Sequence, residues 1–108
     1  NALSLNTSGN NNVSIGDQAL GSNTTASNNS AVGTNALSSN TTGAQNTAIG
    51  YRALLLNTVS GNTAVGAFAL DANTTGTDNV AVGMNALGSN AVSANNTALG
   101  SQVLALNT

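Results

Sequence analysis

The chain has 108 residues, of which 40% are hydrophobic and only 4% are charged, and its formal net charge is −2 at pH 7. With one basic residue, three acidic residues and neither histidine nor cysteine, the sequence offers almost nothing for acid–base, nucleophilic or metal chemistry, so we expect neither an enzyme nor a cofactor or metal site. A single cation cannot neutralise a phosphate backbone and no apolar run has the length of a membrane span, which argues against nucleic-acid binding and against membrane insertion by this segment.

The sequence is a tandem repeat with a period of about 17 residues. The motif Asn-x-[Ala/Ser]-[Val/Ile/Leu]-Gly returns after 17, 17, 16, 17 and 17 residues, and the positions of each repeat are numbered from its first asparagine. The repeats start at Asn12, Asn29, Asn46, Asn62, Asn79 and Asn96. Because residues 1–7 match positions 7–13 and the chain stops at position 13, we expect residues 1–108 to be one array taken from a longer one.

Three further columns of identical residues run through the repeats. Position 5 is always glycine: Gly16, Gly33, Gly50, Gly66, Gly83 and Gly100. Position 9 is always leucine: Leu20, Leu37, Leu54, Leu70, Leu87 and Leu104. Position 12 is always asparagine, including Asn23, Asn40, Asn57, Asn73 and Asn90. We predict that the asparagines of positions 1 and 12 form amide ladders between coils, that the glycines serve a β-bulge or a positive φ, and that the leucines face inward.

The repeat pattern predicts an all-β fold, a parallel β-solenoid of about six 17-residue coils. Positions 2–4, such as 47–49 and 80–82, place β-branched residues around a small one, and positions 8 and 9 form a second short apolar segment. We therefore expect two short strands per coil and a height of roughly 30 Å. If position 4 points inward, position 2 shares that side, and position 3 points the other way.

Alanine fills position 3 in five repeats and position 8 in five repeats, although alanine has poor strand propensity. These strands are therefore expected to be buried on both faces. An exposed alanine stripe would favour self-association. We predict a homotrimer whose seam holds the position 8 column or the alanines of position 3, which are Ala31, Ala48, Ala64, Ala81 and Ala98. The alternative is a monomeric solenoid whose alanine columns fill a thin interior.

Residues 46–54 and 62–70 resemble the YadA-type head repeat of trimeric autotransporter adhesins, in which a Ser/Asn-Val/Thr-Ala-Ile-Gly core precedes two variable residues and alanine. The pattern is also similar to repeat shafts of phage tail fibres, and it covers six near-complete coils. The resemblance implies a left-handed parallel β-roll with three chains side by side, in an extracellular head or stalk that adheres to host or matrix surfaces. The family coil is usually a few residues shorter, with an Ala-x-Gly turn where this chain has Leu-x-x-Asn-Thr.

The most variable positions are 6, 7, 10 and 11. At two of them, Tyr51, Arg52 and Phe68 fall on successive coils and form a candidate surface patch for a host-surface or matrix ligand. The alternative is that these residues are scattered, tolerated substitutions.

We expect the chain to be a structural segment of an extracellular fibre or stalk that contributes to adhesion, on a cell surface or a virion. One alternative is a subunit of a self-assembling surface filament. Another is an ice-binding β-solenoid that uses the threonine column of position 13, which contains Thr7, Thr24, Thr41, Thr58, Thr74 and Thr108, with Ala91 in one coil.

Overall fold

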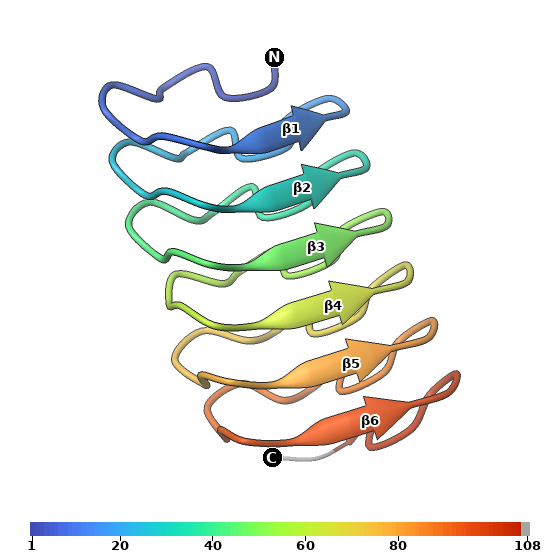
Figure 1. Ribbon diagram of the computed structural model, residues 1–108. Helices are drawn as coiled ribbons and strands as arrows, with labels where there is room; N and C mark the ends of the chain where they lie inside the picture. The colour runs from blue at the N-terminus through green and yellow to red at the C-terminus, as the bar shows by residue number, and fades with distance from the viewer. Residues whose placement is uncertain (107–108) are drawn as a thin grey trace.

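The computed structural model describes residues 1–106 and forms a parallel β-solenoid of about 17 residues per coil, as predicted (Figure 1). Each coil contributes one three-residue strand to a single six-stranded sheet with the order β1-β2-β3-β4-β5-β6. The strands are β1 (Val13–Ile15), β2 (Ser30–Val32), β3 (Thr47–Ile49), β4 (Thr63–Val65), β5 (Val80–Val82) and β6 (Thr97–Leu99). The molecule measures 35 × 21 × 16 Å.

The strands pair in parallel and in one constant register. Ala48 of β3 lies opposite Ala31 of β2 and Ala64 of β4, so the same repeat position is stacked in every coil. The register survives the 16-residue coil between Asn46 and Asn62, because the missing residue falls outside the strand. In Figure 1 the strands run along the front, and the chain returns behind them while it descends toward the C-terminus, so the coil is left-handed.

The second apolar segment of each coil is a turn, so the prediction of two strands per coil is wrong. In the third coil the N–H of Ala53 donates to the carbonyl of Gly50 at 3.2 Å, whereas the N–H of Leu54 donates to Ala69 of the next coil at 3.0 Å. Arg52 and Leu54 have φ values of 59° and 53°. An extended strand requires negative φ, and the alternating left-handed residues instead fold the chain back along the sheet.

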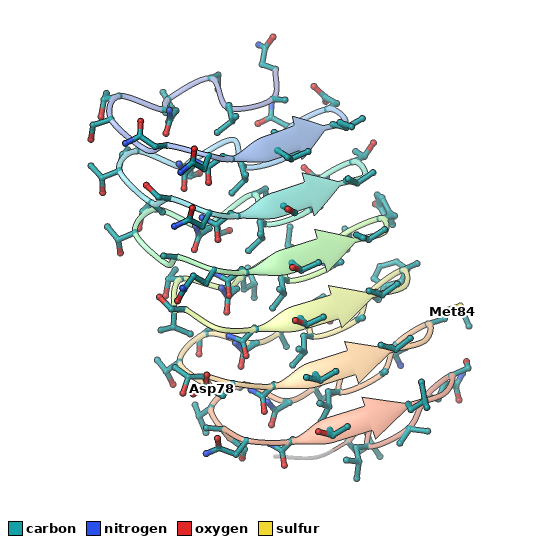
Figure 2. The ribbon with its side chains drawn as sticks, in the orientation of Figure 1. Asp78 and Met84 are labelled. Carbon is teal, nitrogen blue, oxygen red and sulfur yellow. The ribbon has the colours of Figure 1, made fainter. Side chains whose placement is uncertain are left out.

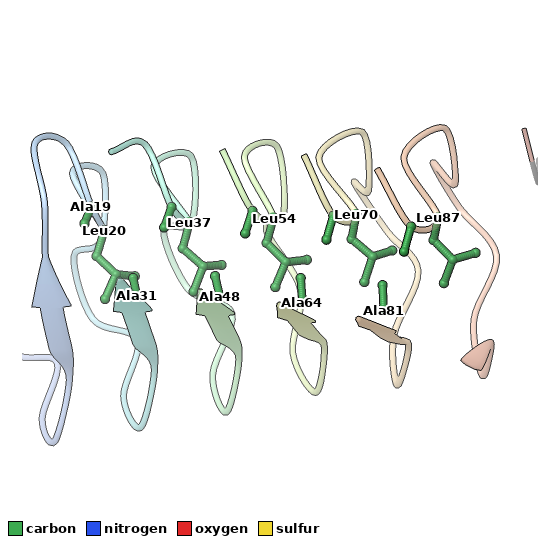
Figure 3. Packing of buried hydrophobic residues seen from close by; sticks show 14 of the residues in the cluster. Ala19, Leu20, Ala31, Leu37, Ala48, Leu54, Ala64, Leu70, Ala81 and Leu87 are labelled. Atoms are coloured by element: carbon green, nitrogen blue, oxygen red, sulfur yellow. The ribbon is translucent and has the colours of Figure 1, made fainter. Parts of the chain in front are cut away.

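The interior lies between the sheet and this returning segment (Figure 3). Position 3, and not position 4, points into it. The alanines of position 3 are at most 1% exposed in Ala31, Ala48, Ala64, Ala81 and Ala98. The other buried apolar residues are the alanines of position 8 and the leucines Leu20, Leu37, Leu54, Leu70 and Leu87. In the last coil described, Val103 and Leu104 are 38% and 47% exposed.

The predicted inward and outward faces of the strands are therefore reversed. Ile15 and Ile49 of position 4 are 61% and 42% exposed, and Val80 of position 2 is 39% exposed. The physical reason is that the interior is thin: each leucine of the returning segment points toward the sheet and leaves room only for a methyl group, as Leu37 and Ala48 show in Figure 3. The strands are buried on one face only.

The reversal also removes the predicted trimer seam. Both alanine columns are fully enclosed within a single chain, so they cannot meet another copy. A polar substitution such as Ala64→Gln would disrupt the interior of one chain, whatever its oligomeric state. Any contact between copies has to use another surface.

Candidate functional site

The asparagines at position 1 form a buried ladder that links the coils. Asn46 Oδ1 accepts the backbone N–H of Asn62 at 2.9 Å, and the N–H of Asn46 donates to Asn29 Oδ1 at 2.9 Å. Asn46 Nδ2 also donates to the carbonyl of Val59 at 2.8 Å. The ladder connects Asn12, Asn29, Asn46, Asn62, Asn79 and Asn96. Each amide therefore replaces a backbone hydrogen bond where the strand begins, and it closes its own coil.

The asparagines at position 12 donate to the same carbonyl as those at position 1. In the third coil Asn57 Nδ2 donates to the carbonyl of Val59 at 2.7 Å, so this oxygen accepts two amide groups. The equivalent carbonyls in coils 1 to 5 are those of Ala26, Gly43, Val59, Gly76 and Ser93. Two amides thus hold each turn, both of them buried in coils 2 to 5, and they satisfy a carbonyl that the sheet does not reach.

The ladder of position 12 is interrupted at the shorter coil. Asn23 Nδ2 donates to Asn6 Oδ1 at 2.8 Å, and Asn40 Nδ2 donates to Asn23 Oδ1 at 3.3 Å. Asn40 Oδ1 and Asn73 Oδ1 are both buried, and neither has a hydrogen-bond partner among the described residues. Asn57, the next member, bonds a carbonyl two residues ahead, where its counterparts bond one three residues ahead. The missing residue therefore lies in this turn. The ladder also lacks a bond at Asn73, between coils of full length, so the interruptions are not confined to the shorter coil.

Substitution Asn46→Ala is expected to lower the free energy of unfolding by about 2–4 kcal/mol. The change leaves the N–H of Asn62 without its acceptor and removes one of the two donors to Val59, and each unsatisfied buried group costs about 1–3 kcal/mol. Urea unfolding followed by circular dichroism would measure the loss. The exposed Asn10 provides the control, and Asn10→Ala should change stability by less than about 0.5 kcal/mol. Equal losses in the two variants would contradict a structural role for the ladder.

The glycines at position 5 stack backbone on backbone at the end of each strand. Gly66 has a φ of 133°, and a Cβ built on it would lie 2.6 Å from the carbonyl carbon of Gly83 in the next coil. The left-handed φ and the close approach of the next carbonyl both exclude a side chain. This column therefore allows the coils to stack at the point where the chain leaves the sheet.

The threonines at position 13 also serve coil stacking. Thr24 Oγ1 donates to the carbonyl of Thr41 at 3.3 Å, and Thr74 Oγ1 donates to that of Ala91 at 2.9 Å. Thr7 and Thr58 make the same bond to the next coil. These hydroxyl protons are therefore engaged within the protein, and Ala91 interrupts the column. The predicted member Thr108 lies outside the described residues.

The outer face of the sheet presents two parallel ranks of side chains. Position 2 contributes Val13, Ser30, Thr47, Thr63, Val80 and Thr97, and position 4 contributes Ile15, Val32, Ile49, Val65, Val82 and Leu99. We call these twelve residues the sheet face. None of them is charged, and the apolar members include residues that are 39–76% exposed. An uncharged and partly apolar surface of this kind is typical of a contact site.

The candidate patch of Tyr51, Arg52 and Phe68 is brought together. The rings of Tyr51 and Phe68 are perpendicular with centroids 5.3 Å apart, and the guanidinium carbon of Arg52 lies 5.3 Å from the centroid of Phe68. Arg52 Nη2 is also 3.7 Å from Asp71 Oδ2. Sequence reasoning missed Asp71. A signal was available, because Asp71 lies three residues beyond Phe68 in the coil that follows Arg52.

Burial raises the pKa of the Asp71 carboxyl above its usual value of 3.8, although the positive charge of Arg52 opposes the shift. The folded state therefore holds the Asp71 proton more tightly than the unfolded state, and the resulting stability is present below pH 3.8 and is lost as the pH rises through the raised pKa. We expect Asp71→Asn to be more stable than the unchanged protein at pH 7, with an advantage that shrinks as the pH falls toward 3.8. Thermal unfolding at several pH values would test this. An advantage that grows with acidity would contradict it.

Residues 1–106 contain no group of three histidine, cysteine, aspartate or glutamate side chains that could hold a metal ion, and no pocket opens on their surface. No helix long and apolar enough to cross a membrane occurs in this part of the chain. The chain matches no family model, no curated protein and no solved structure. The distinctive features of residues 1–106 are therefore the ladders, the sheet face and the cluster of Tyr51, Arg52 and Phe68, which we call the aromatic patch.

Proposed function

We propose that the chain is a structural repeat segment of an extracellular fibre or stalk that contributes to surface adhesion, and that it functions as a homotrimer. The observation that carries this proposal is the unbroken register of six coils, in which every coil offers the next one the same hydrogen-bonding edge. Stacking such coils extends the molecule by about 4.8 Å per coil with no change in cross-section. This geometry suits a rod, because length is gained without any new core.

The sheet face supports self-association. Three residues across and six strands along give it dimensions of about 10 by 29 Å, or roughly 300 Å² per chain, which is in the range of functional surface patches. It lies parallel to the long axis of the solenoid, so parallel copies can meet along their whole length. We therefore place the trimer contact on this face and not on the alanine columns.

Sedimentation equilibrium over a dilution series tests the proposal. We expect three chains of 10.4 kDa at high concentration and dissociation on dilution, because roughly 300 Å² is less than the ~800 Å² per partner of a standard stable interface. The double variant Ile49→Lys with Val65→Lys should remain one chain at all concentrations, since both side chains point outward and the interior is untouched. Circular dichroism would verify its fold.

Ser89→Lys, in the exposed part of the returning segment, is the matched control and should associate like the unchanged protein. One chain at every concentration of the unchanged protein would overturn the trimer. A mass that keeps growing with concentration would instead support the self-assembling filament.

A further inference from the structure

The aromatic patch is chemically unlike the rest of the described surface. It contains both aromatic residues and the single basic residue of the sequence, whereas the coils on either side carry Thr34 and Asn35, and Met84 and Asn85, at the same positions. Met84 of position 6 marks this edge of the solenoid in Figure 2, opposite the edge marked by Asp78. Tyr51 occupies position 6 two coils earlier, so it lies on the same edge, beyond the end of the sheet face.

The contacts within the patch fix the orientation of Tyr51. Phe68 contacts both the guanidinium of Arg52 and the Tyr51 ring, and Arg52 is in turn paired with Asp71. Tyr51 is nevertheless 47% exposed, so the perpendicular contact with Phe68 leaves much of its ring open to solvent. An aromatic ring that is held in place and exposed is preorganised for contact at little cost in conformational entropy.

The surroundings of the ring indicate the chemistry of a ligand. Asp71 balances the charge of Arg52, so the patch does not select an anion or a cation. At position 7 the coils on either side carry the uncharged residues Asn35 and Asn85, so no further charge flanks the patch at this position. The described surface has no pocket, so the ligand has to lie flat on the ring. A pyranose fits these conditions, since its C–H face is apolar and its rim carries hydroxyl groups that amides and charged groups can bond.

We infer that Tyr51, supported by Phe68 and Arg52, is a docking platform for a neutral saccharide chain. This inference rests on the proposed adhesive function and gives it a ligand class. A protein partner is less well matched, because a standard interface needs about 800 Å² per side. The aromatic patch extends over only two coils, and its flanks are uncharged amides.

The sequence provides its own probe, because Tyr51 is its one tyrosine and no tryptophan is present. Tyrosine fluorescence therefore reports on this site alone. We would titrate the unchanged protein with a panel of neutral oligosaccharides that includes chitohexaose and maltohexaose, with sialyllactose as the charged comparison. We expect a saturable fluorescence change with at least one neutral member, accompanied by shifts of the Tyr51 and Phe68 ring protons in NMR spectra.

Three variants distinguish a loss of saccharide binding from a loss of the fold. Phe68→Ser should weaken binding by about tenfold or more, and Tyr51→Phe, followed by NMR, should retain it because stacking needs no hydroxyl. Met84→Ser alters an exposed residue of the same edge two coils away and should leave binding unchanged. Loss of structure in Phe68→Ser would appear in circular dichroism, and the NMR shifts of the Tyr51 and Phe68 ring protons in the unchanged protein would then still locate the binding site.

The absence of a saturable response to every neutral saccharide would overturn the inference, as would an equal loss of binding in Met84→Ser. A response to sialyllactose alone would also overturn it, and binding only to a protein would identify a protein contact instead. Because the titration is read at Tyr51 and the trimer is read from mass, the two proposals can fail separately.

Discussion

Replacing Leu54 by alanine should lower the free energy of unfolding by about 2–5 kcal/mol, the range for a fully buried leucine. Leu54 is 0% exposed and fills the thin interior between the sheet and the returning segment. The backbone on both sides is held by hydrogen bonds between coils, from Leu37 to Ala53 and from Leu54 to Ala69, each 3.0 Å long. The walls of the resulting cavity therefore cannot close, and the loss should approach the upper part of the range.

Urea unfolding would measure this effect, with Leu56→Ala as the control. Leu56 belongs to the same coil but is 46% exposed, so its truncation should cost less than about 1 kcal/mol. Similar losses for Leu54→Ala and Leu56→Ala would show that the leucine column does not form the core.

Gly66→Ala should lower the free energy of unfolding about as much as Leu54→Ala does, by about 2–6 kcal/mol. A side chain at a φ of 133° is strained by about 1–3 kcal/mol, and its Cβ would lie 2.6 Å from both the carbonyl carbon and the carbonyl oxygen of Gly83. Relief of that overlap requires a backbone shift, which costs about 1–3 kcal/mol more. The shift would also strain the hydrogen bond from the N–H of Gly83 to the carbonyl of Val65, which is 2.7 Å long.

Gly21→Ala is the matched control for this prediction. A Cβ on Gly21 would lie 2.9 Å from the flexible end of the Gln18 side chain and 3.2 Å from the Gln18 carbonyl oxygen, and other coils carry serine, leucine, aspartate or alanine at this position. We expect Gly21→Ala to be close to neutral, since alanine reduces the entropy of the unfolded chain. A neutral Gly66→Ala would contradict the close backbone stacking at position 5.

The period, the strands at positions 2–4 and the solenoid class could be predicted, because each coil must put the same residue types in the same place. The direction of the strand faces could not be predicted from alternation, which separates two faces without saying which one is enclosed. A signal was present: Thr47 and Thr63 share the side of position 4, whereas position 3 is almost entirely alanine. Hydroxyl groups on one side and methyl groups on the other favour position 3 as the interior side.

The returning segment was harder to predict. Leucine rarely adopts a positive φ, yet Leu37 and Leu54 have φ values of 52° and 53°. Burial of the side chain and the N–H bond to the next coil together hold this conformation. The unfavourable φ is offset only when the coils are stacked, so no local sequence rule predicts this conformation.

The aromatic patch followed from the repeat numbering, which puts Arg52 and Phe68 at the same position of successive coils. The ion pair with Asp71 did not, because position 10 was regarded only as a variable turn position. The spacing from Phe68 indicated only that Asp71 lies nearby, whereas the turn conformation brings position 7 of one coil within reach of position 10 of the next.

A distance measurement between copies tests the central claim that the sheet face joins parallel chains. The sequence has no cysteine, so Thr63→Cys carries a single spin label, and any dipolar coupling must arise between chains. Packed sheets lie about 10 Å apart, so three sheet faces that meet around one axis should give one distance on the order of 10–20 Å in dipolar spectroscopy, and Thr47→Cys should give the same distance if the chains are parallel and in register. A label at Ser89→Cys should give a longer distance. No coupling at Thr63→Cys, or a distance no shorter than that at Ser89→Cys, would contradict the claim.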